Sequence, residues 1–527
     1  MKKYIFIGLI SLSLITSSCE DWLNAPTPGT TKLNDFFTSG TTAIQSVNAA
    51  YVPLMWEYNS TYYSEWFIGD VVSDDALKGG QSVGDMSDVY DMENFKTNTN
   101  NTFLLDYYRA QYQGIGRCNL VLQEVPVMNT DTIMDLRMKN RLIGETKFLR
   151  AMYYFRLVRV FGGIPLIDYV VDSSNKWKQP RATAADIYSF IVNDLEDAQS
   201  KLWKKSEYST ADLGRATKGA AQAMLLKTYL YMHQYDKAKQ WGDSIIDSNE
   251  YSLVKYHDNF TLSGENGNES VFEIQYMDDP MSDYGEGNGF TRGTFTVILT
   301  RSRSTELGGG WGFNKPTQNL YNEYEPGDPR RDETILNPTD DQIQTPEQEI
   351  YLHSTRYVNR KYSMMNEDGT FSALSHNTRA PLNNKVIRYS DVLLMYAEAC
   401  CENNDLNRAK WALEQVRNRA RQGDNSILPA FPYETIIQGT SVKYNDTKDD
   451  LIKAIRHERR VELAMEGHRW FDLCRWGIVK EVMDAYKMTE NEEVQSHMAP
   501  FITGKHELFP IPSQEIELSG IEQNPGY

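Results

Sequence analysis

The sequence has little positive charge for its size and no long hydrophobic run beyond its first fifteen residues. Its 527 residues include 54 Lys and Arg against 72 Asp and Glu, which gives a formal net charge of −18 at pH 7. Because phosphate binding depends on clustered Lys and Arg, this balance argues against a nucleic-acid partner. Mean hydropathy is −0.54, and no later run approaches the ~20 apolar residues that a membrane-spanning helix needs.

Motifs of catalysis and of metal binding are also sparse. There is no GxSxG, no P-loop and no GxGxxG at the start of a helix, and the SxxK at Ser173 to Lys176 lacks its companion motifs. His457 and His468 lie eleven residues apart, whereas a zinc-binding HExxH helix places its histidines four apart. We therefore expect no enzyme, no metal and no cofactor. A glycosidase stays a minor alternative, because sequence alone cannot locate two carboxylates ~5 to 9.5 Å apart.

Cysteine is scarce, with five residues and no CxxC or Cys/His ligand spacing. Cys118, Cys400, Cys401 and Cys474 all lie in helical patterns, and the two adjacent cysteines point to different faces of their helix. We expect these four residues to be buried free thiols. Cys19 differs from them because it directly follows a segment with the pattern of an export signal.

The N-terminus has the pattern of that export signal. Two lysines precede an apolar stretch over residues 4–15, and three small residues then lead to Cys19. We predict a lipoprotein signal peptide over residues 1–18 and a lipid anchor on Cys19. Two or more acyl chains hold a protein stably at a membrane, whereas a single chain holds it only marginally. An ordinary cleaved signal followed by an incidental cysteine is the alternative.

The stretches that follow predict a tether and then helices. Residues 19–45 are rich in Pro, Gly, Thr and Ser, which predicts an extended tether. A helical pattern extends from about residue 103 to 161. Its apolar face repeats at steps of three and four residues: Phe148, Met152, Phe155 and Val158. Another helix is expected over residues 184–202, because Thr183 and Asp186 have the spacing of a capping box at its start.

Two later segments look like helix-turn-helix repeats of the tetratricopeptide kind. They cover residues 223–246 and 391–416. In such a repeat a small residue of the second helix lies against the first helix, and Ala238 and Ala409 match each other in this role. The two alanines are 171 residues apart, so the repeats do not form a tandem array. The intervening chain must leave the scaffold and return to it.

The stretch between the repeats loses its helical period. Between residues 251 and 385 glycine is dense, and short apolar runs such as Phe295–Leu299 predict strands. Binding residues concentrate on loops that a rigid frame carries, so we expect a ligand face in this insertion. The expected fold is mainly α, with tetratricopeptide-like helix pairs forming a scaffold and a loop-rich insertion containing short β-strands. The scaffold is expected over residues 46–250, with N-terminal ligand-face loops, and over 386–527, with the C-terminal closure.

Six ordered blocks of the chain resemble the SusD/RagB family of outer-membrane nutrient-binding lipoproteins. They extend from the N-terminus to the last residue, so the resemblance spans nearly the whole chain. The blocks are CEDWL at 19–23, KFLRAMYYFRLVRVFGGIPLI at 147–167, GWGFNKPTQNLYNEYEPGDPRRD at 310–332, IRYSDVLLMYAEA at 387–399, ERRVELAMEGHRWFDLCRW at 458–476, and LFPIPSQEI with QNPGY at 508–527.

The resemblance implies a place and a partner for the protein. It implies lipid anchoring through Cys19 in the outer membrane, display at the cell surface, and docking on a TonB-dependent transporter of the SusC type. Glu20 and Asp21 look like the acidic signal that sends such lipoproteins to the cell exterior. The family includes binders of starch and other glycans and members associated with peptides, so the resemblance alone does not fix the ligand.

Two non-helical regions combine the side chains that a glycan site needs. Sugar rings have apolar C–H faces that stack on flat side chains, and their hydroxyls need polar partners. The first predicted set of ligand contacts is Trp66, Asp70, Asp74 and Lys78. The second predicted set is Tyr284, Asn288, Phe290, Arg292 and Trp311. Trp470 and Trp476 lie in helical patterns and are expected in the core.

Together these observations predict a non-enzymatic, cell-surface lipoprotein that captures an oligosaccharide and delivers it to a partner transporter. The alternative with the same architecture is a receptor for peptides or another nutrient. A surface glycosidase and a purely structural adaptor are the alternatives from other classes.

Overall fold

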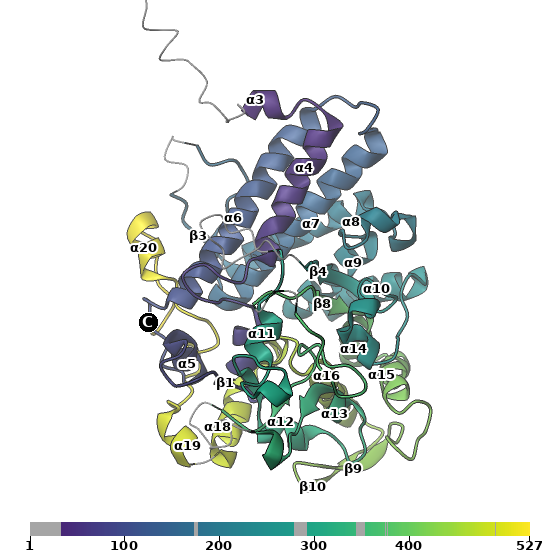
Figure 1. Ribbon diagram of the computed structural model, residues 1–527. Helices are drawn as coiled ribbons and strands as arrows, with labels where there is room; N and C mark the ends of the chain where they lie inside the picture. Colours follow the sequence, from purple (N-terminus) through teal and green to yellow (C-terminus); the bar gives the residue numbers. More distant parts are fainter. Residues whose placement is uncertain are drawn as a thin grey trace, which may run out of the picture.

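The computed structural model describes residues 33–172, 178–278, 292–343, 354–374, 376, 378–490 and 492–527. The predicted signal peptide, the predicted lipid anchor on Cys19 and the first part of the predicted tether lie within residues 1–32, outside this part of the chain. Helices dominate the described residues and form a scaffold of packed pairs (Figure 1). No helix among them is both long enough and apolar enough to cross a membrane.

Three helices form the upper part of the scaffold in Figure 1. They are α4 (Gly40–Tyr51), α6 (Thr102–Glu124) and α7 (Leu136–Phe161), and each packs against the other two. Asp135 caps the start of α7, where its side chain accepts from the amide of Met138, and Gly162 ends the helix at a φ of +69°. The predicted apolar face of α7 is confirmed, because all four of its residues are buried.

Helix α8 (Ala184–Lys201) begins as predicted. The side chain of Thr183 accepts from the amide of Asp186, and the Asp186 carboxylate accepts from the amide of Thr183. This reciprocal pair satisfies two backbone donors that would otherwise have no partner within the helix. Helix α8 lies between α7 and α9 (Lys218–Tyr231) and so connects the upper helices to the predicted repeats.

The two predicted repeats are confirmed as helix pairs, and they stack on each other. The first consists of α9 and α10 (Tyr235–Ser248), the second of α14 (Tyr389–Glu402) and α15 (Leu406–Ala420). Ala238 and Ala409 are fully buried between their helices. Helix α10 packs on α14, and a Cβ on Gly242 would lie 2.3 Å from the Tyr396 ring. The repeats are therefore distant in sequence but adjacent in space.

The insertion between the repeats returns to the scaffold through an antiparallel strand pair. Strand β4 (Ser270–Ile274) follows the first repeat and pairs with β8 (Asn384–Arg388), which leads directly into α14. The pairing brings the two ends of the insertion together, so the helices before and after the insertion can pack on each other. Within the described residues the other strand pairs are β1 (Ala76–Gly79) with β5 (Phe313–Pro316), β2 (Ile164–Pro165) with β3 (Arg181–Ala182), β6 (Ile335–Leu336) with β7 (Val358–Asn359), and β9 (Tyr433–Ile437) with β10 (Thr440–Tyr444).

One predicted strand is wrong. The run Phe295–Leu299 forms most of a short helix, α11 (Thr296–Thr300), whose residues are all buried. A run of five residues is too short to show the period of a helix or that of a strand. A segment that is buried on all sides is mostly apolar in either structure, so its sequence does not distinguish them.

The remaining helices complete the described chain. They are α3 (Leu33–Phe36), α5 (Ser87–Glu93), α12 (Gln318–Glu323), α13 (Arg330–Thr334), α16 (Lys448–Leu463), α17 (Arg469–Arg475), α18 (Val479–Thr489), α19 (Glu492–His497) and α20 (Ser513–Ser519), with single turns η1 (Val52–Met55), η2 (Phe67–Val71), η3 (Val125–Val127), η4 (Lys205–Glu207), η5 (Thr210–Asp212), η6 (His257–Phe260), η7 (Leu262–Gly264), η8 (Thr305–Leu307) and η9 (Asp340–Gln342). Helix α16 packs against α14 and extends the scaffold beyond the second repeat.

The four described cysteines are free, as predicted. Cys118, Cys400 and Cys401 are buried, and Cys474 is partly buried. Burial raises the pKa of the Cys118 thiol above its ordinary range. These thiols are therefore packing residues of the helices.

Candidate ligand-binding surface

The first predicted set of ligand contacts is buried, which corrects that prediction. Trp66 is 4% exposed, and its indole Nε1 donates to Thr296 Oγ1 at 3.2 Å. Asp70, Asp74 and Lys78 are 0%, 2% and 0% exposed. Side chains with so little exposed area cannot contact a ligand at the protein surface, so these four residues are part of the protein interior.

Each of the three charged residues in this set has internal partners. Asp74 accepts two hydrogen bonds from the guanidinium of Arg469, at 2.8 and 2.9 Å, and contacts Arg460 at 2.8 Å. The ammonium of Lys78 donates to three backbone carbonyls, at distances between 2.6 and 3.1 Å. Asp70 accepts from the amide of Gly467 at 2.8 Å and from a side-chain amide, and burial raises its pKa to about 8. The Asp74 contacts tie the segment after η2 to α16 and α17, whereas the Lys78 contacts stay within that segment.

The second predicted set is only partly within the described residues. Tyr284, Asn288 and Phe290 lie outside them. Arg292 is exposed, and its carbonyl accepts from the amide of Met277. Trp311 is partly buried and meets the ring of Tyr62 edge to face, with centroids 5.6 Å apart. Arg292 and Trp311 therefore stay predictions, and Trp311 leads to a group of rings that includes Tyr62.

Three partly exposed rings lie together at this place. Tyr62 stands between Trp311 and Tyr58, with its centroid 4.9 Å from that of Tyr58. Below them the buried ring of Phe295 lies 5.0 Å from Tyr62 and 6.0 Å from Tyr58. We call Tyr58, Tyr62 and Trp311 the aromatic surface. It joins a turn after η1 to the loop before β5.

A buried carboxylate fixes the aromatic surface to the insertion. Glu57 is 4% exposed and accepts from the amide of Phe295 at 2.7 Å and from the hydroxyls of Thr294 and Thr296. Burial raises the pKa of Glu57, and these hydrogen bonds oppose that rise. Glu57 therefore holds α11 and the turn that carries Tyr58 in one arrangement.

A second carboxylate fixes the turn itself. Asp106 of α6 accepts from the side-chain amide of Asn59 at 2.9 Å and from the backbone amides of Ser60 and Thr61. Asn59 and Ser60 are exposed beside the rings. On the other side the guanidinium of Arg303 donates to the carbonyl of Trp311 at 3.3 Å. Flat rings with polar groups at their edge can bind a ligand that has both an apolar face and hydroxyls.

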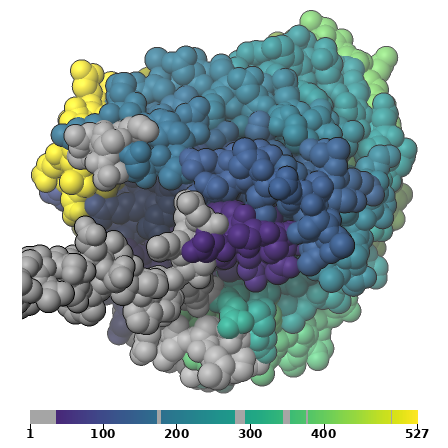
Figure 2. Space-filling model, turned by 90° about the horizontal axis from the view of Figure 1, so that it is seen from above, coloured from purple at the N-terminus to yellow at the C-terminus, as the bar shows by residue number. Residues whose placement is uncertain are grey.

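The surface is hollowed beside α4, as Figure 2 shows. The Tyr58–Tyr62 turn is not among the predicted ligand contacts, because the first predicted set begins at Trp66. The signal was present, since Asn, Ser and Thr between tyrosines are typical of an exposed turn, whereas Trp66 begins an apolar run.

The block that contains His457 and His468 is architectural. Its sequence places Arg459 and Glu462, Glu466 and Arg469, and Asp472 and Arg475 three residues apart. Of these three pairs, only Asp472 with Arg475 forms an ion pair among the described contacts, at 2.8 Å. Arg459 instead contacts Asp391 and Asp472, while Glu466 contacts Lys361 and Arg388, and Arg469 contacts Asp74 and Asp75. The described residues contain no group of three or more His, Cys, Asp or Glu side chains placed to hold a metal.

The two histidines of this block have opposite environments. Burial by itself would lower the pKa of His457, but hydrogen bonds to Glu323 and Glu325 raise it to about 9. Burial and the nearby Lys227 lower the pKa of His468 to about 3. His457 is therefore a buried cation of the ion-pair network, and His468 is a neutral packing residue. The prediction for Trp470 is also confirmed, since it is 1% exposed, whereas Trp476 is only partly buried.

Comparison with known proteins matches both ends of the chain to related families. A model described as the SusD family matches residues 331–527, and one described as starch-binding, associating with the outer membrane, matches residues 30–230. The chain is 26% identical to the SusD-like protein P2 of Formosa agariphila over the full length of both proteins.

Solved structures agree with this match along nearly the whole chain. One is titled a laminarin binding SusD-like protein and is 28% identical, with a TM-score of 0.75 over 93% of this chain and all of that one. Another is the surface glycan-binding protein A from Bacteroides thetaiotaomicron in complex with laminarihexaose, 24% identical, with a TM-score of 0.75 over 92% of this chain and all of that one. The helical scaffold, the paired repeats and these matches together show that the chain belongs to the SusD/RagB family.

Proposed function

We propose that this protein is a non-enzymatic, cell-surface lipoprotein that binds a glycan on its aromatic surface and delivers it to a SusC-type TonB-dependent transporter. The observation that carries the proposal is the group formed by Tyr58, Tyr62 and Trp311, held rigidly by Glu57 and Asp106. Rings fixed in advance lose little conformational entropy when a sugar stacks on them, so shallow contact suffices for binding.

The ligand class is supported by the comparison with a binder of known ligand. The structure that is 28% identical is named for binding laminarin, a neutral glucan. Two exposed polar residues, Asn59 and Ser60, lie at the edge of the described part of the aromatic surface, and Asp106 fixes their side chains. A neutral glycan is therefore the ligand that we propose, with laminarin as its first probe.

Anchoring and delivery belong to the same proposal. One matching family is described as associating with the outer membrane, and Cys19 follows the predicted signal peptide. We propose that acyl chains on Cys19 hold the protein at the cell surface beside the transporter. Tethering keeps the local concentration of the binding surface high at the transporter, so that even a weak intrinsic affinity supports uptake.

Affinity electrophoresis tests glycan binding. Laminarin, amylopectin and glucomannan are cast into native gels, and the wild type is expected to be retarded by at least one of them. Trp311→Ala and Tyr62→Ala are expected to lose most of that retardation. Trp411→Ala is the matched control, because Trp411 is also partly buried but lies on α15 of the scaffold.

Three results would contradict the proposal. They are unretarded wild type in every gel, equal retardation of the Trp311→Ala and Trp411→Ala variants, and release of reducing sugar from any of the glycans by the purified protein. If oligopeptides raise the melting temperature of the protein and no glycan retards it, the protein is a peptide receptor with the same architecture.

A further inference from the structure

A groove lies along η1, whose last residue, Met55, comes three residues before Tyr58 of the aromatic surface. It has a volume of about 250 Å³. One wall comes from the end of α4 and from η1, the opposite wall from β4, and η5 with the following turn closes the third side. The lining residues used below are Asn48, Val52, Met55, Leu213, Arg215, Glu273 and Gln275.

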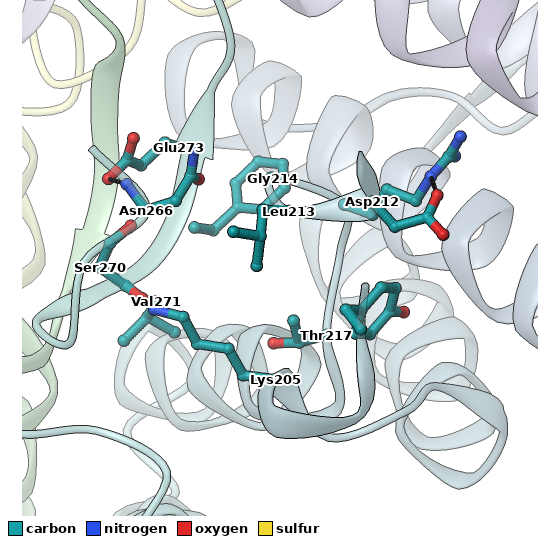
Figure 3. A pocket seen from close by; sticks show the side chains of 12 residues that line it. Lys205, Asp212, Leu213, Gly214, Thr217, Asn266, Ser270, Val271 and Glu273 are labelled. Atoms are coloured by element: carbon teal, nitrogen blue, oxygen red, sulfur yellow. Dashed lines mark hydrogen bonds and ion pairs between the residues drawn. The ribbon is translucent and has the colours of Figure 1, made fainter. Parts of the chain in front are cut away.

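A small recess of about 20 Å³ adjoins the groove and shares Leu213, Gly214 and Glu273 with its lining. Figure 3 shows this recess, with Leu213 at its centre and Lys205, Thr217 and Glu273 around it. Gly214 forms the corner at a φ of +93°, and a Cβ there would lie 2.4 Å from the side chain of Gln275. Glycine thus allows the turn to close against β4 and gives the groove its end wall.

One wall of the groove leads along the chain to the aromatic surface, and the opposite wall is joined to it at Met55. Met55 ends η1, and Tyr58 follows three residues later, within about 10 Å along the chain. On the opposite wall β4 continues to Tyr276, whose hydroxyl donates to the carbonyl of Met55 at 3.4 Å. A chain-like ligand that leaves the aromatic surface over η1 therefore enters the groove.

The charged groups that line the groove are neutralised by their own partners. Arg215 contacts Glu145 at 3.1 Å and Asp212 at 2.7 Å. Glu273 is buried and paired with Lys385. The groove therefore offers a charged ligand no unpaired opposite charge among the described residues, and it fits a neutral occupant.

The recess follows the same pattern. Lys205 donates to the carbonyls of Gly267 and Ser270, at 2.5 and 2.8 Å. Its ammonium is thus occupied by the protein and is not a ligand for an anion.

The remaining lining has the mixture that suits a sugar ring. Val52 and Met55 are half-buried and Leu213 is 41% exposed, so they offer an apolar floor and wall. Asn48 is exposed, and its Oδ1 accepts from Arg215 at 2.9 Å, while within the described residues its Nδ2 donates no hydrogen bond. The volume is below the ~300–1,000 Å³ of most ligand pockets, so the groove has room for a ring or two and not for a large molecule.

We propose that this groove is a second subsite, which takes a neutral sugar unit of the same glycan chain whose other units lie on the aromatic surface. The inference rests on the proposed function and adds a preference for longer chains. Affinity therefore rises with chain length beyond the length that the aromatic surface alone covers.

Calorimetric titration tests the subsite. The glycan that retards the wild type is partially hydrolysed, and its oligosaccharides are titrated by increasing length into the wild type, Leu213→Arg, Leu518→Arg and Trp311→Ala. Leu213→Arg places a long side chain in the groove, and Leu518→Arg is its control at an exposed leucine of α20. We expect Leu213→Arg to bind short chains within twofold of the wild type and the longest chains at least fivefold more weakly. Leu518→Arg should match the wild type, and Trp311→Ala should weaken binding at every length.

The outcomes separate the two proposals. If Leu213→Arg matches the wild type at every length while Trp311→Ala is weak, the second subsite is wrong and the proposed function stands. If Leu213→Arg instead reduces only co-purification of a transporter, the groove is a protein contact and the inference is overturned. If no oligosaccharide binds the wild type, both proposals fail.

Discussion

Two regions of this molecule share one composition and have opposite roles. Residues 66–78 and the aromatic surface both combine rings with polar groups, yet the first is buried and the second faces solvent. The difference lies in the exposure of the polar side chains. Asp74 and Lys78 are paired inside the protein with arginines or carbonyls, whereas Asn59 and Ser60 sit on an exposed turn. Rings beside polar residues therefore indicate a binding site only where these side chains reach the surface of the fold.

The buried region should respond most strongly to loss of a charge. Arg460 contacts Asp74, Asp75 and Glu323, all of which are nearly buried. Arg460→Met leaves three carboxylates without that cation, and we expect a loss of roughly 3–5 kcal/mol in unfolding free energy. Urea unfolding measures it. Lys480→Met is the control, because the Lys480 and Asp484 side chains are about half exposed and should contribute less than ~1 kcal/mol. Equal stability of the two variants would contradict the account of this network.

A second substitution in the buried region separates folding from binding. Lys78→Met leaves three carbonyls without their shared donor, which we expect to cost roughly 1–3 kcal/mol in unfolding free energy. Glycan affinity of the folded variant should equal that of the wild type, as measured by titration below its melting temperature. A loss of glycan affinity without a loss of stability would show that Lys78 contributes to ligand binding.

On the aromatic surface the expected effects are reversed. Trp311→Ala removes the largest of the three rings, and we expect about a tenfold loss of glycan affinity, or ~1.4 kcal/mol. Trp66→Phe keeps a ring in the interior and should leave affinity unchanged. Titration of both variants with the same oligosaccharide gives the comparison, and a greater loss in Trp66→Phe would break it.

The smallest effect concerns pH. Burial raises the pKa of Asp70 to about 8 from 3.8, so the folded state holds a proton that the unfolded state releases. The stability from this proton is fully present below about pH 4 and is lost as pH rises towards 8. Asp70→Asn should therefore flatten the fall in melting temperature between pH 5 and pH 8. An unchanged slope would show that the Asp70 pKa is near its ordinary value.

The scaffold was predictable because its signals are local. The face of α7, the capping box at Thr183 and the small residues Ala238 and Ala409 are each visible within one or two helices of sequence. The placement of the first ligand set was not predictable in this way. The partner of Asp74 is Arg469, 395 residues further along the chain, and no local pattern shows that these two residues meet.

The site was predictable in part for the same reason. Trp311 is predictable from its glycine-flanked segment, but its neighbour Tyr62 lies 249 residues earlier in the sequence. Glu57 joins the turn that carries Tyr58 to Thr294 and Phe295, through contacts more than two hundred residues apart in sequence. The local sequence therefore indicates which aromatic residues are candidate ligand contacts. Tertiary contacts determine which of them share one surface.

Hydroxyl-radical footprinting with and without a bound polysaccharide tests the central claim most directly. We expect Tyr58, Tyr62 and Trp311 to be labelled in the free protein and protected when the glycan is added, with Trp66 unlabelled in both states. Protection confined to other residues, or labelling of Trp66 that the glycan suppresses, would contradict the assignment of binding to the aromatic surface.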